Sequence, residues 1–281
     1  MKLSVGVPCY AQSEFLPGLI ASLAELPCVE ILIVDDGNPE PLQLPGRDDR
    51  VRVVRHPRNL GIAASRNTLI REAVGELILF LDADAELTGA PASWISRFRA
   101  EERLAAVTGR GFEDGSGGAA NRWRRWFWPQ DHGPSAVRVP FAYGICCVWR
   151  RAVLLELGGF DSSHRTHGED IDLSFRATGA GWVIRHEPEL TVLHRRRDSL
   201  ASLLTMIWNH SFYFSAVCRR HHHPLYRRAL VNAVKWLPIT IASSVIRHRD
   251  LPMALISVPA GAVSIAGRLA APFSAAARTR G

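Results

Sequence analysis

The stretch of sequence that decides the fold is Leu77-Ile78-Leu79-Phe80-Leu81-Asp82-Ala83-Asp84. Five consecutive apolar residues predict a short strand buried on both faces, as in parallel sheets that helices cover. Two carboxylates follow the strand, with one residue between them. Because alternate residues of an extended chain point the same way, Asp82 and Asp84 can face one point. The stretch therefore predicts a buried strand that ends at a polar site.

Three more apolar runs precede this stretch and are predicted strands: residues 3–7, 30–34 and 51–55. Residues 141–149 are predicted to form a further apolar strand. A helical spacing of apolar residues lies between the first two runs, and a second helix is predicted from about Ile62 to Val74. This alternation predicts an α/β fold with a mostly parallel, Rossmann-like central sheet flanked by helices. We assign residues 1–197 to this domain.

Polar clusters follow three of the predicted strands: Pro8-Cys9-Tyr10, Asp35-Asp36 and Asp82-Ala83-Asp84. The first strand is expected to stop at Pro8. The carboxyl ends of parallel strands meet at one edge of a sheet, and ligands bind beyond that edge. We therefore expect the three clusters to converge on a single site.

Asp82 and Asp84 suit a divalent cation, Mg²⁺ or Mn²⁺, because these hard cations prefer carboxylate oxygens. Such a cation could neutralise the charge that develops on a departing diphosphate. His194 follows a strand-like segment, residues 182–193, and could complete the metal shell. The competing interpretations are an acidic turn that closes a strand and a partly buried histidine with no ligand.

Four other charged residues also have two interpretations each. Glu169 and Asp170 open a predicted helix, where they could supply a general base for an acceptor hydroxyl or simply cap the helix dipole. Asp36 could accept a hydrogen bond from uracil or ribose, or stabilise a turn. Arg66 could pair with phosphate through its planar guanidinium, or lie solvated on a helix.

The bulk composition fits a globular protein, with 47% hydrophobic and 22% charged residues. No secretory signal is expected at the amino terminus, because Pro8 and Tyr10 cut the apolar run short. Five cysteines, an odd number without CxxC spacing, are expected to be reduced thiols of a cytosolic protein. The net charge of +7 is concentrated after Arg195, where arginine and histidine abound.

Residues 198–281 have a different composition, which predicts a helical, basic and apolar extension that associates with an anionic membrane surface. Its uncharged stretches, residues 236–246 and 251–267, are short for a membrane span of about 20 residues. Pro238, Pro252 and Pro259 are expected to interrupt them. An in-plane amphipathic or re-entrant attachment is therefore favoured over two spans.

Residues 111–120 are rich in Gly and Ala and are expected to form a mobile loop. The loop leads into Arg122-Trp123-Arg124-Arg125-Trp126-Phe127-Trp128. This cluster could be an acceptor platform, a membrane-interface patch or a nucleic-acid surface. The sequence carries no compact nucleic-acid motif, so no nucleic-acid partner is expected.

In combination, these segments resemble the family 2 glycosyltransferases, which have the GT-A fold. The resemblance runs from about residue 2 to residue 195. It rests on the order and spacing of six segments: Val7–Tyr10, Ile33–Gly37, Asn59–Asn67, Phe80–Asp84, Gly158–Asp161 and Gly168–Arg176. Two small departures, Ser65 and Cys146-Cys147, do not touch the expected chemistry.

The resemblance implies an inverting transfer from a nucleotide-diphospho-sugar, with UDP favoured and dTDP or GDP as alternatives. The acceptor would be a hydroxyl, lipid-linked in relatives with similar tails, at the cytoplasmic inner face of the cell membrane. The implied roles fall into three groups. Pro8, Tyr10, Asp36, Asn59, Arg66 and Asp82 would bind the nucleotide-sugar; Asp84 and Asp82 with His194 would hold the metal; Asp170, with Glu169 beside it, would be the catalytic base.

Two rival functions remain open at this point. A sugar-phosphate nucleotidyltransferase would be expected to carry a Gly-rich phosphate loop after the first strand, where this chain has Pro8-Cys9-Tyr10-Ala11-Gln12. A non-catalytic relative, kept as a binding subunit, would not need the acids that this chain has. A dehydrogenase would need a GxGxxG turn after a strand, and no predicted strand is followed by one.

Overall fold

The computed structural model describes residues 1–44, 48–90 and 93–271. The chain divides into two compact units. The N-terminal unit comprises residues 1–112 and 130–195, and the C-terminal unit comprises residues 113–129 and the chain from Arg196 onward. The division predicted after residue 197 lies near the last junction. Residues 113–129, which the sequence interpretation left in the first domain, belong to the second unit.

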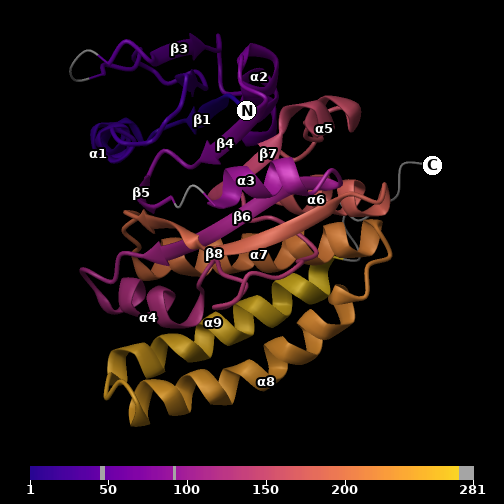
Figure 1. The fold of residues 1–281 in the computed structure, drawn as a ribbon. Coiled ribbons are helices and arrows are strands. Elements are labelled where there is room, and N and C mark those ends of the chain that lie inside the picture. Colours follow the sequence, from indigo (N-terminus) through magenta and orange to yellow (C-terminus); the bar gives the residue numbers. More distant parts are fainter. Residues whose placement is uncertain (45–47, 91–92, 272–281) are drawn as a thin grey trace. The chain divides into compact units, whose positions relative to one another are not determined.

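The N-terminal unit contains an eight-stranded sheet in the order β3-β2-β1-β4-β7-β6-β8-β5, with helices on its faces (Figure 1). The strands are β1 (Leu3–Cys9), β2 (Glu30–Asp35), β3 (Val51–Arg55), β4 (Leu77–Leu81), β5 (Ala85–Gly89), β6 (Leu104–Glu113), β7 (Cys146–Arg150) and β8 (Val183–His194). The helices are η1 (Ser13–Phe15), α1 (Leu16–Ser22), α2 (Ile62–Glu72), α3 (Ser93–Ala100), α5 (Arg151–Glu156) and α6 (Glu169–Gly179).

The parallel part of the sheet brings the predicted strand ends together. Strand β1 pairs in parallel with β2 on one side and with β4 on the other, and β2 pairs in parallel with β3. Cys9 lies opposite Asp35 in this register. Strand β7 then runs antiparallel to β4, with Leu81 opposite Cys146. The predicted α/β class is confirmed, and the antiparallel β7 adds a second wall beside the end of β4.

Two apolar clusters fill the two faces of the sheet. One joins α1 and α3 to the side chains of Leu3, Val5 and Val7. The other joins α2, α5 and α6 to the opposite face, which includes Ile78 and Phe80. Successive side chains of β1 and β4 point to opposite faces of the sheet and so enter both clusters. Every residue of these two strands is therefore buried. Burial on both faces is the reason that these strands read as continuous apolar runs.

Three sequence expectations about element boundaries were wrong. Strand β1 continues past Pro8, because beyond Gly6 it pairs only with β2, and a one-sided ladder tolerates a residue without an N–H. Residues 141–145 do not join β7, because the backbone N–H groups of residues 142–144 donate to side chains. The expected loop at 111–120 is reduced to residues 114–118 by β6 and the next helix.

The C-terminal unit is helical. Its elements are α4 (Ala119–Phe127), α7 (Leu200–Arg220), α8 (Leu225–Ile246) and α9 (Leu251–Ala270). Trp123 of α4 is fully buried and packs edge-on against Trp236 of α8, with ring centroids 5.3 Å apart. Ser199 caps α7 in a capping box with Ser202, and Asp250 caps α9 through the N–H of Met253.

The prolines of the C-terminal unit do not divide its helices, contrary to the sequence expectation. Helix α8 continues through Pro238, and α9 starts at Leu251 and continues through Pro259. Both helices are long and apolar enough to cross a membrane by length and composition, with 22 and 20 residues. A proline loses one backbone hydrogen bond, and packing within a helical unit can offset that loss.

Candidate active site at the strand ends

A buried ion network connects the end of β4 to the start of α6. Arg66 of α2 donates from Nη1 to Glu169 Oε1 at 2.5 Å and from Nη2 to Asp82 Oδ1 at 3.1 Å. Its Nη2 also donates to the carbonyl oxygen of Gly144, at 3.0 Å. The Arg66 and Glu169 side chains are buried, whereas that of Asp82 is 29% exposed. The network therefore ends at a carboxylate that solvent can reach.

Arg66 does not lie solvated on its helix, so that interpretation is wrong. Its guanidinium is 5.6 Å from the Phe160 ring centroid and 6.0 Å from that of Phe80. A phosphate partner would need Arg66 to release Asp82 or the Gly144 carbonyl. In the present geometry Arg66 orients two acids, and direct phosphate pairing stays a prediction.

Gly144 fits this network because it has no side chain. A Cβ atom at this position would lie 2.6 Å from Arg66 Nη2. The N–H of Gly144 donates to Asp170 Oδ2 at 2.9 Å, while its carbonyl accepts from Arg66. One residue therefore connects the arginine to the second acid of α6.

Glu169 and Asp170 lie at the N-terminus of α6 but differ in environment. Burial, and after it the nearby charge of Asp170, raise the pKa of Glu169 to about 8 against the opposing charge of Arg66. Glu169 Oε2 is buried and has no hydrogen-bond partner. Asp170 is only half-buried, and its two oxygens accept the N–H groups of Gly144 and Ile171. Asp170 is thus the more accessible of the two acids.

Asp84 and His194 meet, as the metal hypothesis requires. His194 Nε2, from the end of β8, lies 3.1 Å from Asp84 Oδ1, and both side chains are buried. Gln12 donates from Nε2 to Asp84 Oδ2 at 2.6 Å. Asp82 is bonded to Arg66 instead. Burial raises the pKa of Asp82, and the charge of Asp84 raises it too, with Arg66 and His194 opposing.

The side chains of Asp82, Asp84 and His194 suit a divalent cation by their donor types, with Asp84 and His194 already in contact and Asp82 turned to Arg66. Two carboxylates and an imidazole are ligands of the kind that Mn²⁺ and Mg²⁺ sites use. The mutual repulsion of Asp82 and Asp84, seen in the raised pKa of Asp82, is the repulsion that a bound cation would relieve. His194 lies at the end of β8, whereas Asp82 and Asp84 follow β4. A bound ion would therefore connect the ends of two strands.

The Asp36 carboxylate forms hydrogen bonds with groups of the protein itself. It accepts the N–H of Leu60 at 3.0 Å and the N–H of Gly61 at 2.9 Å, and His56 Nδ1 lies 2.7 Å away. Gly61 has a positive φ of 94° and begins α2. Asp36 therefore fixes the turn that leads into α2. Asp36 could therefore act on a nucleoside in two ways. It could shape the turn that contacts the nucleoside, or its carboxylate oxygens could accept a further hydrogen bond.

The turn held by Asp36 forms one wall of a surface pocket of about 380 Å³. The lining residues are Arg58, Asn59, Leu60, Ser162 and Arg165. Asn59, predicted to bind nucleotide, is thus on a concave surface with two arginines. Pro8 is buried at the end of β1, and the following Tyr10 is 48% exposed.

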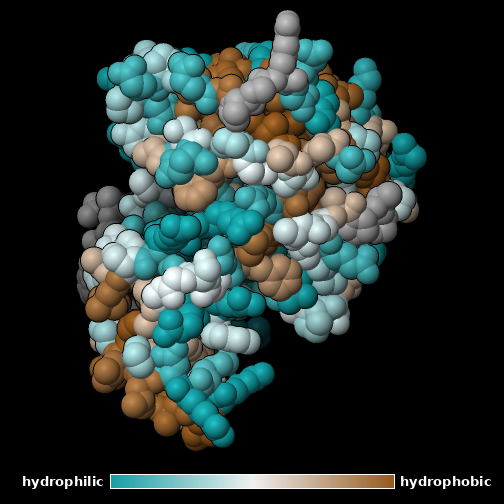
Figure 2. All heavy atoms as spheres, turned by 90° about the vertical axis from the view of Figure 1, so that its left-hand side faces the viewer, coloured by the Kyte–Doolittle hydropathy of each residue, from teal (hydrophilic) through white to brown (hydrophobic). Residues whose placement is uncertain are grey.

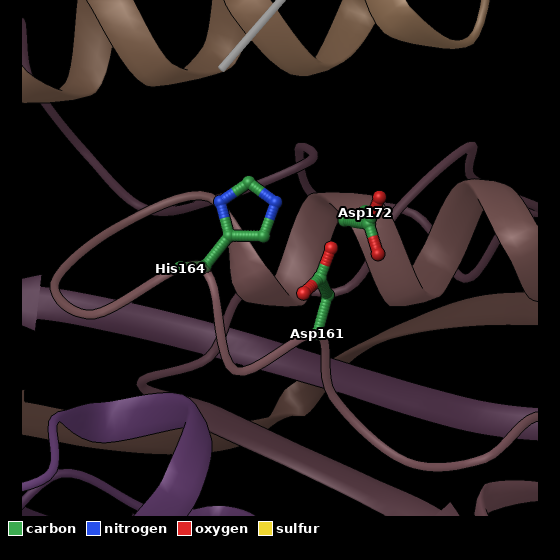
Figure 3. A group of neighbouring side chains, drawn as sticks. All are labelled: Asp161, His164 and Asp172. Carbon is green, nitrogen blue, oxygen red and sulfur yellow. The ribbon is translucent and has the colours of Figure 1, made fainter. Parts of the chain in front are cut away.

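A cluster that the sequence interpretation missed lies beside this pocket wall. Asp161 and His164 of the loop before α6 and Asp172 of α6 point toward one another (Figure 3), with one ligand-type atom of each within 4.8 Å of the others. Arg176 Nε donates to Asp172 at 2.9 Å, and His164 Nδ1 lies 3.2 Å from the carbonyl oxygen of His167. Because Arg176 neutralises Asp172, protein charges account for the cluster as an anchor of the loop on α6.

Gln12 and Gly144 were also missed. Gln12 lies just after β1, in the segment that the sequence interpretation noted for Pro8 and Tyr10. No sequence pattern marks the Gln12 side chain as a partner of Asp84. Gly144 falls inside a predicted strand, where a glycine with no turn signal is the only indication of a close backbone approach.

Comparison with known proteins identifies the class of this chain. Residues 4–158 match the sequence model of glycosyl transferase family 2. The match covers more than half of the chain, and the chain belongs to this family.

Three proteins of known name are similar in sequence to parts of this chain. The pre-mycofactocin glycosyltransferase of Mycobacterium tuberculosis is 26% identical over 272 residues, which cover 91% of this chain and 56% of that protein. The O-antigen biosynthesis protein RfbC of Myxococcus xanthus is 26% identical over 71% of this chain and 18% of its own length. An N-acetylglucosaminyl-diphospho-decaprenol L-rhamnosyltransferase of M. tuberculosis is 32% identical over 83 residues, 26% of this chain and 27% of that protein. The chain thus spans about half of the first relative.

Two solved structures share the fold. GalNAc-T7 with UDP, GalNAc and Mn²⁺ has a TM-score of 0.57 at 17% identity, over 78% of this chain and 50% of that one. The mannosyltransferase PcManGT of Pyrobaculum calidifontis, in complex with GDP-Man and Mn²⁺, has a TM-score of 0.54 at 16% identity, over 98% and 75%. The GT-A fold expected from the sequence is confirmed.

Proposed function

We propose that this chain is an inverting glycosyltransferase that moves a sugar from a nucleotide-diphospho-sugar to an acceptor hydroxyl, in the synthesis of a cell-envelope polysaccharide or glycolipid. One observation carries the proposal. At the end of β4, Asp84 contacts His194 while Asp82 is connected through Arg66 to the acids of α6. A site for a leaving diphosphate and a site for a base thus share one strand end. Family membership supports the same reaction.

Asp170 is proposed as the base. The acceptor oxygen forms a bond to the anomeric carbon as its proton passes to the Asp170 carboxylate. The bond from the anomeric carbon to the diphosphate oxygen breaks, and its electron pair leaves with the nucleoside diphosphate. Attack opposite the leaving group inverts the anomeric configuration. The N–H bonds from Gly144 and Ile171 would hold the Asp170 carboxylate in position for this transfer.

Asp84, His194 and Asp82 are proposed to hold the cation, Mg²⁺ or Mn²⁺, which would supply neutralisation of the charge on the leaving diphosphate. Gln12 would keep Asp84 in place through its 2.6 Å hydrogen bond. Glu169 would act on Arg66 and on Asp170 and would not touch the acceptor, because its side chain is buried. Support for a metal comes from the two structures of similar fold that contain Mn²⁺.

The donor is proposed to carry UDP, with dTDP or GDP as alternatives, since structures of similar fold hold UDP in one case and GDP-Man in the other. Pro8, Tyr10, Asp36 and Asn59 would line the nucleoside pocket. The acceptor is proposed to be lipid-linked, because one relative is named for a diphospho-decaprenol substrate. The reaction would then take place at the cytoplasmic face of the cell membrane.

A panel of UDP-, dTDP- and GDP-sugars, each with Mn²⁺, Mg²⁺ or EDTA, tests the proposal by release of nucleoside diphosphate. We expect one donor class to be turned over only with metal, and Asp84→Ala to abolish this turnover. Glu72→Ala, at a half-exposed ion pair with Arg52 in the same unit, is the matched control. Near wild-type turnover in Asp84→Ala would overturn the metal assignment. Pyrophosphate release from sugar-1-phosphate and nucleoside triphosphate would instead indicate a nucleotidyltransferase.

Asp170→Asn tests the base separately. Loss of a general base typically lowers the rate about 10²- to 10⁴-fold. We expect donor binding, measured by calorimetry, to be unchanged while transfer slows by about hundreds-fold. An unchanged transfer rate would mean that Asp170 only caps α6.

A further inference from the structure

Helix α9 of the C-terminal unit has its side chains arranged in the reverse of a helix in a water-soluble bundle. The exposed positions of α9 are all apolar: Leu251, Pro252, Leu255, Val258, Ala262, Ala266 and Leu269. Leu255 is 74% exposed and Val258 is 53% exposed. The buried positions of the same helix are mostly small or hydroxylated: Met253, Ala254, Ser257, Ala260, Gly261, Ser264 and Gly267. Large aliphatic side chains thus face outward and small ones face inward.

The contacts that α9 makes with α7 and α8 include close approaches of small and hydroxyl residues. Ser211 of α7 and Ser264 of α9 are buried, with their oxygens 2.9 Å apart. A Cβ at Gly261 would lie 2.6 Å from Leu237 Cδ1 of α8, so the absence of a side chain is what lets these helices meet. Small residues and interhelical hydroxyl bonds are the means by which helices pack when lipid, and not water, surrounds them.

The second half of α8 continues the outward apolar surface. Its exposed residues from Pro238 onward are Pro238, Ile239, Ala242, Val245 and Ile246. The first half is different, because Arg227, Arg228 and Lys235 are exposed there. In Figure 2, apolar side chains gather at the lower end of the view, the height at which Figure 1 shows α8 and α9, next to strongly polar ones.

We infer that α8 and α9 are embedded in one leaflet of an anionic bilayer, with the outward face of α9 and the second half of α8 against the acyl chains. The exposed basic residues of α8, together with Arg247 and Arg249 of the α8–α9 turn, would contact anionic headgroups. Exposed cations beside the apolar face favour lipid over a second copy of this chain as the occupant. The sequence favoured an in-plane amphipathic or re-entrant attachment, and the inference adds which residues of α8 and α9 would face the acyl chains.

A span through both leaflets fits the charges less well. Lys235 is exposed and lies ten residues after Leu225, which is about 15 Å along a helix at 1.5 Å per residue. A hydrocarbon core is about 30 Å thick, so a spanning α8 would put this ammonium near the bilayer centre. Charges there are costly. Lying in the plane of one leaflet, α8 can keep Lys235 at the headgroups.

Single cysteine variants of the full chain on sealed phosphatidylglycerol-containing vesicles test the inference with a membrane-impermeant maleimide. The five native cysteines are buried, and the wild type gives their background. On vesicles we expect Leu255→Cys to react at least about tenfold more slowly than Asn232→Cys. Asn232 is an exposed polar position of α8, so this variant is the matched control for access of the reagent to the unit. The protein should also stay on floated vesicles in molar NaCl.

Each contrary outcome overturns part of the inference. Equal labelling of Leu255→Cys and Asn232→Cys on vesicles would mean that α9 does not face lipid. Arg249→Cys that reacts only after the vesicles are ruptured would mean that the helices span. Crosslinking of Leu255→Cys to itself without lipid would mean that a second copy covers the face, and release by salt would mean that charge alone holds the protein. Donor hydrolysis by the same variants is read separately, so failure here is distinguishable from failure of the proposed reaction.

Discussion

The two units each bury an arginine between two carboxylates, and they use it differently. In the N-terminal unit, Arg66 lies between Glu169 and Asp82, and Asp82 is partly exposed. In the C-terminal unit, Arg124 donates to Glu113 at 2.9 Å and to Asp198 at 2.8 Å, and all three side chains are buried. The first network opens to solvent at a strand end, and the second is closed. A substrate can reach a network that has an exposed carboxylate, so such a network can take part in a reaction. A network of buried side chains can only stabilise the fold.

The carboxyl groups of the two networks shift in opposite directions. Burial raises the pKa of Glu169 to about 8, and a single arginine does not overcome that effect. Burial acts on Asp198 in the same sense, but Arg196 and Arg124 together lower its pKa below the usual value. The number of cations around a buried acid thus decides whether it is held neutral or charged.

The largest expected effect follows from this difference. Arg124→Met would remove the cation that both buried carboxylates contact and leave Asp198 with Arg196, which costs about 3–5 kcal/mol. Arg66→Met should cost less, because Glu169 is already inclined to be neutral, yet it should abolish sugar transfer. Hydrogen exchange of protected amides measures the two units separately. Equal destabilisation by the two variants would contradict the assigned charge states.

A smaller effect compares the two apolar surfaces. Leu79→Ala in β4 removes a fully buried side chain and should destabilise the N-terminal unit by about 2–5 kcal/mol. Leu255→Ala in α9 removes an exposed one and should change stability in detergent by less than about 0.5 kcal/mol. Hydrogen exchange in detergent checks both. A large loss in Leu255→Ala would show that protein, and not solvent or lipid, covers this face.

The most gradual effect is the pH dependence that the two acids give to the stability of their units. A raised pKa means that folded Glu169 keeps its proton after the unfolded chain has lost it, so stability falls as pH rises from about 4.5 to 8. Glu169→Gln cannot titrate, and wild type should lose up to a few kcal/mol relative to it over this range. For Asp198 the sign is opposite, and wild type should lose stability relative to Asp198→Asn only as pH falls below 3.8. Urea unfolding at several pH values measures both differences.

The sequence predicted the strands and their shared edge because an apolar run and the acids that close it are local features. β1, β2, β3 and β4 all lie within three residues of their expected ends. It could not predict the partners of Arg66, since Glu169 lies 103 residues further along the chain. Burial of that arginine depends on how α2 packs against α6. The role of Asp36 was hidden for a similar reason, because its partners are the backbone N–H groups of a turn.

The reversed arrangement of α9 and the helices around it were predicted only in outline. Composition indicated basic and apolar helices, but prolines led to the expectation of interruptions that packing removes. Which residues of α9 face outward is a matter of helix rotation, and its outward and inward stripes are both free of charge until Arg268. Only the neighbouring helices determine which stripe is buried.

Gly144 has a consequence for anyone who wishes to redesign the acceptor preference of this protein. It holds Arg66 with its carbonyl and Asp170 with its N–H, and a methyl group at its Cα would collide with the guanidinium. The base and the cation that orients its neighbour are therefore coupled through one residue that offers no side chain to vary. A library that randomises position 144 would lose both groups together, so diversity is better sought in the exposed residues around the pocket at Asn59.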